Sequence, residues 1–188
     1  MRERLVDLDR QSRTAFAASC AERLLPLFER YARSVGTPES GSRLRAAIDA
    51  AWDAASGLDV NLETYRSEVE LLVPSDAGEW TLEAGYGQNA AAAAAYALRT
   101  WLTDDPQEAV WAARQVYELA DYAALQGGSE SSLNAPGAEA LVLASGPVQH
   151  ALAAIDGTLD AVEARPSSWR ALRAEAEADG RSWESALP

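Results

Sequence analysis

Residues 105–124 read DPQEAVWAARQVYELADYAA and indicate most clearly which fold class the chain adopts. Asp105 stands at an N-cap position, Pro106 follows at the first helical position, and Glu108 comes three residues after the cap, which is typical of a helix start. Apolar residues then recur at spacings of three and four, the period of an α-helix. The residues predicted to face the core are Val110, Ala113, Tyr117, Ala120 and Ala124. The stretch therefore predicts a helix that buries one face.

The same spacing continues in both directions from this stretch, whereas the alternation typical of strands is nearly absent. The other predicted helices cover about 9–34, 42–57, 61–74, 82–101, 138–145, 147–165 and 166–179. Pro26 lies inside the first of them, so that helix either kinks or restarts there. Ser42 is predicted to cap the second helix and Gly57 to end it, while Asn61 caps the third. Gly180 is predicted to end the last one.

We therefore expect an all-α protein, a compact bundle of about seven helices without a sheet. Residues 1–188 are expected to form a single helical domain. Within it, 127–137 (GGSESSLNAPG) is predicted to be a flexible loop, and 166–188 a C-terminal helical appendage. Because alanine supplies much of the hydrophobic fraction, the six tryptophans are expected to fill much of the core.

Composition excludes several classes of function. The net charge is −13, and a polyanion repels phosphate backbones, so nucleic acid is not an expected partner. A basic protein partner, or solubility alone, accounts for this charge. The first ten residues contain no apolar segment of a secretory signal, and no stretch is long and apolar enough to span a membrane. With a single cysteine, Cys20, these features predict a cytoplasmic protein.

The clearest candidate for metal chemistry is Asp104-Asp105-x-x-Glu108, which has the spacing of an aspartate-rich magnesium motif. Pro106 lies inside the motif, however, and places it at a helix start, where helix capping accounts for the acidic residues. No second motif of this kind follows. We therefore expect neither a metal nor a cofactor.

Two residues are candidates for a catalytic role. His150 is the only histidine, which excludes di-iron bundles and three-histidine metal sites. It has no partner at a telling spacing, so a surface or half-buried helical histidine is expected. Cys20 lies at helical spacing from Phe16 and Leu24 and is expected to be a buried, unreactive thiol. The sequence leaves open whether the protein is an enzyme.

Six consecutive alanines, 90–95, predict a helix that is thin on every side. Neighbouring helices then pack closely against it, or a pocket remains beside it. The residues predicted to border such a pocket are Tyr65, Tyr86, Asn89, Tyr96 and Glu118. The preceding Gly85-x-Gly87 pair is too short for a phosphate loop and is interpreted as a turn before the alanine-rich helix.

Four segments resemble the YjaG-like bacterial family, the domain of unknown function 416. In the family's order they are 16–26 (FAASCAERLLP), Tyr86-Gly87 before a small-residue helix, 146–152 (GPVQ-x-AL) and 172–180 (LR-x-EA-x-x-DG). The resemblance implies an all-helical fold of similar length and no assigned activity, and it supplies no site residues. The all-alanine run departs from the family, which usually has an acidic residue there, and so does the ending from Asp179 to Glu184. A divergent member is therefore expected.

Two hypotheses about function follow. The leading one is a non-catalytic module that binds a protein partner, in a regulatory or toxin-neutralising role, because an acidic surface accompanies the absence of a catalytic motif. The alternative is a protein that binds a small molecule, or a cofactor-independent enzyme of a bacterial biosynthetic pathway. It would use the pocket beside the alanine-rich helix, with a tyrosine or carboxylate as acid or base.

Overall fold

The computed structural model describes residues 1–74, 81–126 and 137–187, and one helix, α2 (Arg10–Ser34), lies at their centre. The helices that contact α2 most are α3 (Pro38–Ala55), α5 (Leu82–Thr103), α6 (Pro106–Gln126), α9 (Gly146–Glu163) and α10 (Arg170–Ala186). Every side chain from Ser12 to Phe28 is buried. A helix that is buried on all sides belongs to the middle of a bundle. Small residues at Ala15, Ala18 and Ala21 let the neighbouring helices approach it.

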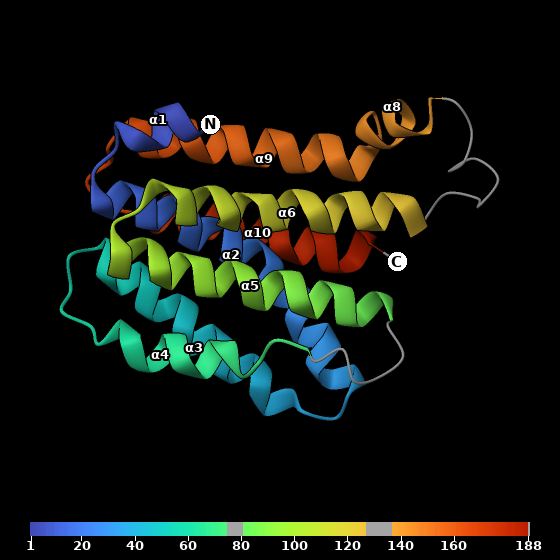
Figure 1. The fold of residues 1–188 in the computed structure, drawn as a ribbon, viewed down its shortest axis with the longest axis horizontal. Coiled ribbons are helices and arrows are strands. Elements are labelled where there is room, and N and C mark those ends of the chain that lie inside the picture. The colour runs from blue at the N-terminus through green and yellow to red at the C-terminus, as the bar shows by residue number, and fades with distance from the viewer. Residues whose placement is uncertain (75–80, 127–136, 188) are drawn as a thin grey trace.

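The predicted all-α fold is confirmed, since the described residues contain no strand. Seven of the described helices have at least seven residues, and α4 (Leu62–Glu70) is the shortest of these. In Figure 1, α9, α6, α5 and α4 lie one below another, with α10 behind them. The short helices are α1 (Arg2–Val6) and α8 (Ala138–Leu143). The sequence did not predict α1, which is held by the buried Leu5 and by ion pairs from Arg4 to α9.

Local signals predicted several helix ends correctly. Asp9 caps α2, accepting a hydrogen bond of 2.7 Å from the backbone nitrogen of Ser12, and this bond lowers the pKa of Asp9. Gly57 follows α3 with a positive φ of 84°, as a helix-ending glycine does. The prediction of a cap at Ser42 was wrong, because Pro38 starts α3 one turn earlier. Pro26 does not restart a helix, since α2 continues through it.

The predictions that glycines interrupt or end helices were wrong at three positions. Gly85 and Gly87 lie inside α5, and Gly180 lies inside α10. A Cβ at Gly85 would stand 2.7 Å from the ring of Tyr122, and one at Gly87 would stand 2.5 Å from the ring of Tyr31. A Cβ at Gly180 would stand 2.7 Å from the carbonyl oxygen of Arg23. These glycines therefore allow close contacts between helices and do not terminate them.

The core consists mainly of alanine and leucine, so the expectation for the tryptophans was only partly correct. Trp52 and Trp183 are buried, while Trp101, Trp111 and Trp169 are half-buried. Along α6 the buried face differs from the predicted stripe. Its members are Glu108, Ala109, Ala112, Ala113, Val116, Leu119, Ala120 and Ala123, whereas Val110, Tyr117 and Ala124 are half-buried. The face is shifted because α6 packs against α2, α5 and α9 together.

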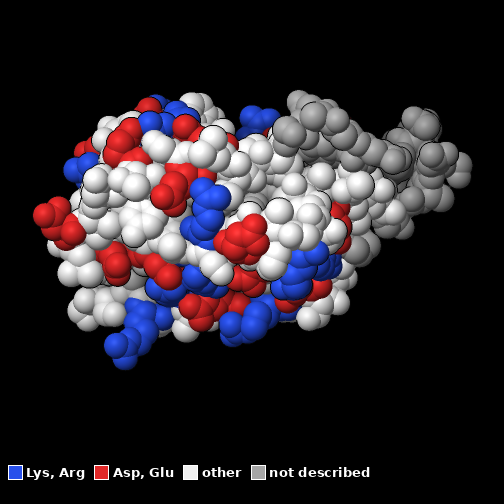
Figure 2. Space-filling view, turned by 90° about the horizontal axis from the view of Figure 1, so that it is seen from below, with Lys and Arg blue, Asp and Glu red and all other residues white. Residues whose placement is uncertain are grey.

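Three features remain: the predicted loop, the absence of a membrane span among the described helices, and the distribution of charge on one face. The segment predicted as a flexible loop, 127–137, lies outside the described residues except for Gly137. Of the helices that the structure describes, none has the length and apolar character needed to cross a membrane. On the face formed by α3 and α4, acidic and basic side chains alternate (Figure 2).

Candidate functional site

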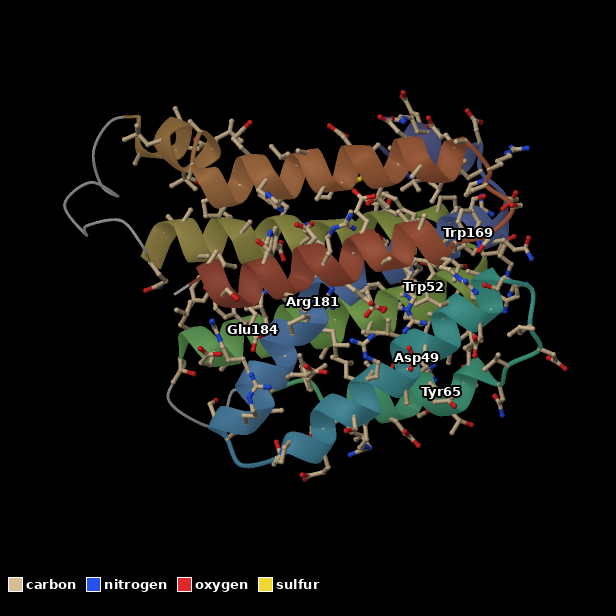
Figure 3. All side chains as sticks on the ribbon, turned by 180° about the vertical axis from the view of Figure 1, so that it is seen from behind. Asp49, Trp52, Tyr65, Trp169, Arg181 and Glu184 are labelled. Atoms are coloured by element: carbon tan, nitrogen blue, oxygen red, sulfur yellow. The ribbon has the colours of Figure 1, made fainter. Side chains whose placement is uncertain are left out.

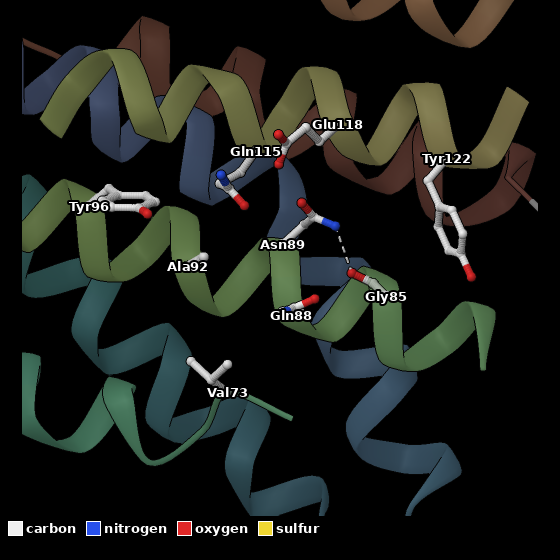
Figure 4. A pocket seen from close by; sticks show the side chains of 9 residues that line it. All are labelled: Val73, Gly85, Gln88, Asn89, Ala92, Tyr96, Gln115, Glu118 and Tyr122. Carbon is white, nitrogen blue, oxygen red and sulfur yellow. Dashed lines mark hydrogen bonds between the residues drawn. The ribbon is translucent and has the colours of Figure 1, made fainter. Parts of the chain in front are cut away.

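An open cleft of about 400 Å³ lies between α5 and α6, next to the segment that follows α4. The residues that line it are Val73, Gly85, Gln88, Asn89, Ala92, Tyr96, Gln115, Glu118 and Tyr122. Figure 4 shows Asn89 on α5 opposite Gln115 and Glu118 on α6, with Tyr96 and Tyr122 toward the two ends. Most of the lining side chains are therefore polar or aromatic, and they come from two adjacent helices.

The alanine-rich run explains why there is room for this cleft. Ala90, Ala91, Ala93 and Ala94 are buried against neighbouring helices, as close packing predicts, whereas Ala92 is half-buried and lines the cleft. A single alanine at this point leaves space that a larger side chain would fill. Both interpretations of the run therefore apply, each to a different face of α5.

The glycine at the N-terminal end of α5 shapes the cleft in two ways. Gly85 has no side chain, so the ring of Tyr122 lies directly against α5. The Gly85 carbonyl accepts a hydrogen bond of 2.8 Å from the side-chain nitrogen of Asn89, one turn further along the helix. This bond fixes the orientation of the Asn89 amide, because a carbonyl oxygen accepts and does not donate.

The structure brings three of the five predicted pocket residues together. Asn89, Tyr96 and Glu118 line the cleft. Tyr86 is fully buried behind it, edge-on to Tyr122 with ring centroids 6.4 Å apart, and burial raises the pKa of Tyr86 to about 12. Tyr65 lies on α4, half-buried against the core (Figure 3), and does not line the cleft.

Three further lining residues, Gln88, Gln115 and Tyr122, were not predicted from the sequence. Their positions relative to Asn89 and Glu118 carry a signal that was available. Gln88 precedes Asn89, while Gln115 and Tyr122 flank Glu118 at spacings of three and four. Residues at these spacings share one helix face, so Gln115 and Tyr122 belong with Glu118 once α5 and α6 are adjacent.

The aspartate-rich motif does not converge on one point. Asp104 pairs with Arg13 at 2.5 Å, and Asp105 accepts a hydrogen bond of 2.9 Å from the backbone nitrogen of Gln107. Glu108 pairs instead with Arg99 at 2.7 Å. The capping interpretation is therefore confirmed for Asp105 and wrong for Glu108, which was expected to reach back to the cap. No group of three or more His, Cys, Asp or Glu side chains in the described residues is placed to hold a metal ion.

Two buried groups have shifted pKa values without forming a site. Cys20 is buried, as predicted, and this burial raises the pKa of its thiol to about 12, which makes it a poor nucleophile. Burial also raises the pKa of Glu108, although the guanidinium of Arg99 opposes this shift. Neither group faces the cleft between α5 and α6.

Sequence reasoning missed a network of buried charges between α2 and α10. Glu22 is fully buried and accepts a hydrogen bond of 2.9 Å from the indole nitrogen of Trp52. It also pairs with Arg45 and lies 3.5 Å from the Nε of Arg173. Arg23, 2% exposed, pairs with Asp179 at 2.8 Å. The available signal was the Glu-Arg pair within 15–28 (AFAASCAERLLPLF), a stretch of α2 whose other residues are small or apolar.

His150 joins this network at the surface. It is about half exposed, as expected, but its Nε2 lies 2.5 Å from Asp179, which is 29 residues away in the sequence. Its ring also lies against Trp183, with centroids 5.6 Å apart. A second cleft, of about 460 Å³, adjoins His150 between α9 and α10. Asp179 contacts the Nε2 atom of the imidazole, so the contact ties α9 to α10.

Comparisons with known proteins agree with the fold. A family model described as a protein of unknown function (DUF416) matches residues 1–182. A crystal structure of a DUF416 family protein from Shewanella baltica OS155 superposes with a TM-score of 0.78 at 16% sequence identity. The superposition covers 94% of this chain and 92% of that chain. At this identity it shows a shared fold and nothing about activity. No curated protein matches the chain.

Proposed function

The chain belongs to the DUF416 family, a family without an assigned activity, and we propose from its geometry that it binds a small polar molecule in the cleft between α5 and α6. The observation that carries this proposal is that several polar groups in the cleft have no hydrogen-bond partner among the described residues. Gln88, Gln115 and the second carboxylate oxygen of Glu118 make no hydrogen bond to any residue that the structure describes. Polar groups that line one cavity and are not engaged by other described side chains are available to hydrogen-bond a ligand.

The cleft also resembles a ligand site in its composition. Small-molecule sites combine apolar and aromatic walls with a few polar groups that converge on one space. Here Ala92 and Val73 provide apolar surface, two tyrosines provide aromatic edges, and the amide groups provide hydrogen bonds. Because the lining residues come from α5 and α6, which pack along their length, the walls are held by rigid elements.

Blocking the cleft tests this proposal. Phenylalanine in place of Ala92 fills the middle of the cleft, while Ala174→Phe places the same ring on an exposed part of α10. Ligand-observed NMR with a mixture of small neutral, cationic and anionic compounds should detect binding to the parent protein. We expect Ala92→Phe to abolish that binding and Ala174→Phe to leave it unchanged. Binding that survives Ala92→Phe would show that the cleft is not the site.

A second candidate function is the binding of a basic protein partner, and α8 supplies the observation that favours it. This helix has no buried residue, and Leu141 and Leu143 are 66% and 47% exposed. Asp121 and Glu139 border the adjoining groove between α6 and α8, and none of the described residues that line this groove is arginine. An apolar surface with acidic edges fits a basic amphipathic segment.

The test of this second function compares two exposed leucines. Leu141 lies on α8, whereas Leu58 is 56% exposed and lies after α3. A specific basic partner should bind the parent protein and the Leu58→Ser variant in pull-down experiments, and it should be lost from Leu141→Ser and at high salt. Equal retention by the two variants would exclude α8 as the docking surface.

A further inference from the structure

We infer that the molecule bound between α5 and α6 is a small aliphatic amine, a class of ligand that presents hydrogen-bond donors and positive charge. The inference rests on the proposed function and adds the chemistry of the ligand. It follows from which atoms of the cleft are already engaged and which remain available.

Asn89 presents an acceptor to the cleft. Its side-chain nitrogen donates to the carbonyl of Gly85 at 2.8 Å, so its oxygen must face the other way. Figure 4 shows this oxygen directed toward the side of the cleft formed by Gln115 and Glu118. The one amide whose orientation is fixed by a partner therefore offers the cleft an oxygen and not an N–H.

Glu118 presents a second acceptor opposite the first. One of its carboxylate oxygens accepts a hydrogen bond of 2.6 Å from Arg114, and the other makes no hydrogen bond within the described parts of the chain. Arg114 itself is 65% exposed and does not line the cleft. The carboxylate thus keeps a free oxygen on the cleft side, and a charged acceptor forms its strongest hydrogen bonds with cationic donors.

Positive charge is missing from the cleft lining. None of the described residues that line it is arginine, and the chain contains no lysine. Arg99, the guanidinium next to Tyr96, is held by Glu108 at 2.7 Å. An anionic ligand would therefore find no cationic side chain among the described lining residues, and the net charge of −13 would repel it.

The aromatic residues at the two ends of the cleft suit the same ligand. The faces of tyrosine rings carry partial negative charge and attract ammonium groups. The guanidinium of Arg99 lies 5.7 Å from the centroid of the Tyr96 ring, so this ring already contacts one cation. Acceptors in the middle and aromatic rings at the ends fit a short chain with amino groups better than a sugar or an acid.

Three probes of matched length separate charge from shape. They are 1,4-diaminobutane, 1,4-butanediol and succinate, which carry positive, zero and negative charge on the same carbon chain. Calorimetric titration of the full protein should show saturable binding of the diamine. The diol should bind about tenfold more weakly, because its hydroxyl groups carry no positive charge to pair with the Glu118 carboxylate. Succinate should not bind.

Two carboxylate variants distinguish a direct contact between the ligand and Glu118 from a general attraction to the negative charge of the protein. Glu118→Gln should weaken diamine binding about tenfold and diol binding by a smaller factor, because only the diamine loses a pair of opposite charges. Glu70→Gln is the matched control, because Glu70 also pairs with an arginine four residues away but lies on α4, outside the cleft. Each variant removes one negative charge, so diffuse attraction to the acidic surface would be weakened equally in both.

The outcomes distinguish this inference from the proposed function. The inference that the ligand is an amine would be overturned by any of four results. These are equal binding of the diol and the diamine, preference for succinate, failure of all three probes to bind, and equal effects of the two carboxylate variants. If a neutral or anionic compound binds and is blocked by Ala92→Phe, the cleft remains the ligand site and only its amine specificity is wrong. Diamine binding that is sensitive to Glu118→Gln and is blocked by Ala92→Phe supports both.

Discussion

Two helix pairs in this protein use polar side chains in opposite ways. Between α2 and α10, Glu22 and Arg23 are buried, and each has charged or hydrogen-bonding partners. Between α5 and α6, Gln88 and Gln115 are half-buried and have no partner in the described part of the chain. Polar groups that satisfy one another hold helices together, whereas polar groups left unsatisfied beside a cavity are available for a ligand. Pairing, and not polarity, therefore separates the structural region from the candidate site.

The largest expected effect comes from breaking the pairing between α2 and α10. Asp179→Ala leaves the guanidinium of Arg23 buried without its carboxylate, which should lower the free energy of unfolding by about 3–5 kcal/mol. Glu118→Ala, in the exposed pair with Arg114, should change it by about 0.5 kcal/mol or less. Urea unfolding of the two variants measures both values. Similar losses in the two variants would remove the distinction between the regions.

The second expected effect concerns how closely α10 approaches α2. Alanine at Gly180 would place a Cβ 2.7 Å from the backbone oxygen of Arg23, and backbone cannot move aside easily, so about 1–3 kcal/mol should be lost. Gly157 on α9 is the matched control, because a Cβ added there would have no neighbouring atom within 4 Å among the described residues. There the better helix propensity of alanine should add about 0.5–1 kcal/mol. If Gly180→Ala stabilises the protein as Gly157→Ala does, the close contact between α2 and α10 is absent.

These two interfaces also show how far sequence reasoning reaches. Signals between neighbouring residues predicted the helices well, as at Asp105 and Gly57, because capping depends on local backbone geometry. Asn89, Tyr96 and Glu118 were predicted to border one pocket because the alanine run 90–95 leaves a thin helix, and they do line one cleft because α5 and α6 lie side by side.

The contacts between α2 and α10 could not be predicted in this way. Arg23 and Asp179 are 156 residues apart, and no spacing rule connects them. Gly180 has the same local preference for ending a helix as any glycine, but close packing against α2 keeps it inside α10. Tertiary contacts thus decide where local propensity is ambiguous. The same holds for Glu108, which the sequence assigned to a capping box and which Arg99 draws away.

A third expected effect tests a local signal in the helix that carries part of the cleft. Asp105 accepts a hydrogen bond from the backbone nitrogen of Gln107 at the start of α6. Asp105→Ala should therefore cost about 1 kcal/mol, while Asp105→Ser and Asp105→Asn should be nearly neutral because they can cap as well. Denaturant unfolding of the three variants under the same conditions gives the comparison. If Asn is as damaging as Ala, the carboxylate charge matters and capping is not its role.

The smallest expected effect concerns the cleft itself and bears most directly on its interpretation as a binding site. Gln88→Ala and Gln115→Ala should each change the free energy of unfolding by less than about 0.5 kcal/mol, because neither side chain has a protein partner to lose among the described residues. Urea unfolding of the two variants, with Asp179→Ala as the contrasting case, measures this. A ligand that uses these amides should bind both variants more weakly despite their unchanged stability. Losses near those of buried polar pairs would instead place Gln88 and Gln115 in the architecture of the bundle, and the cleft would then resemble the interface between α2 and α10.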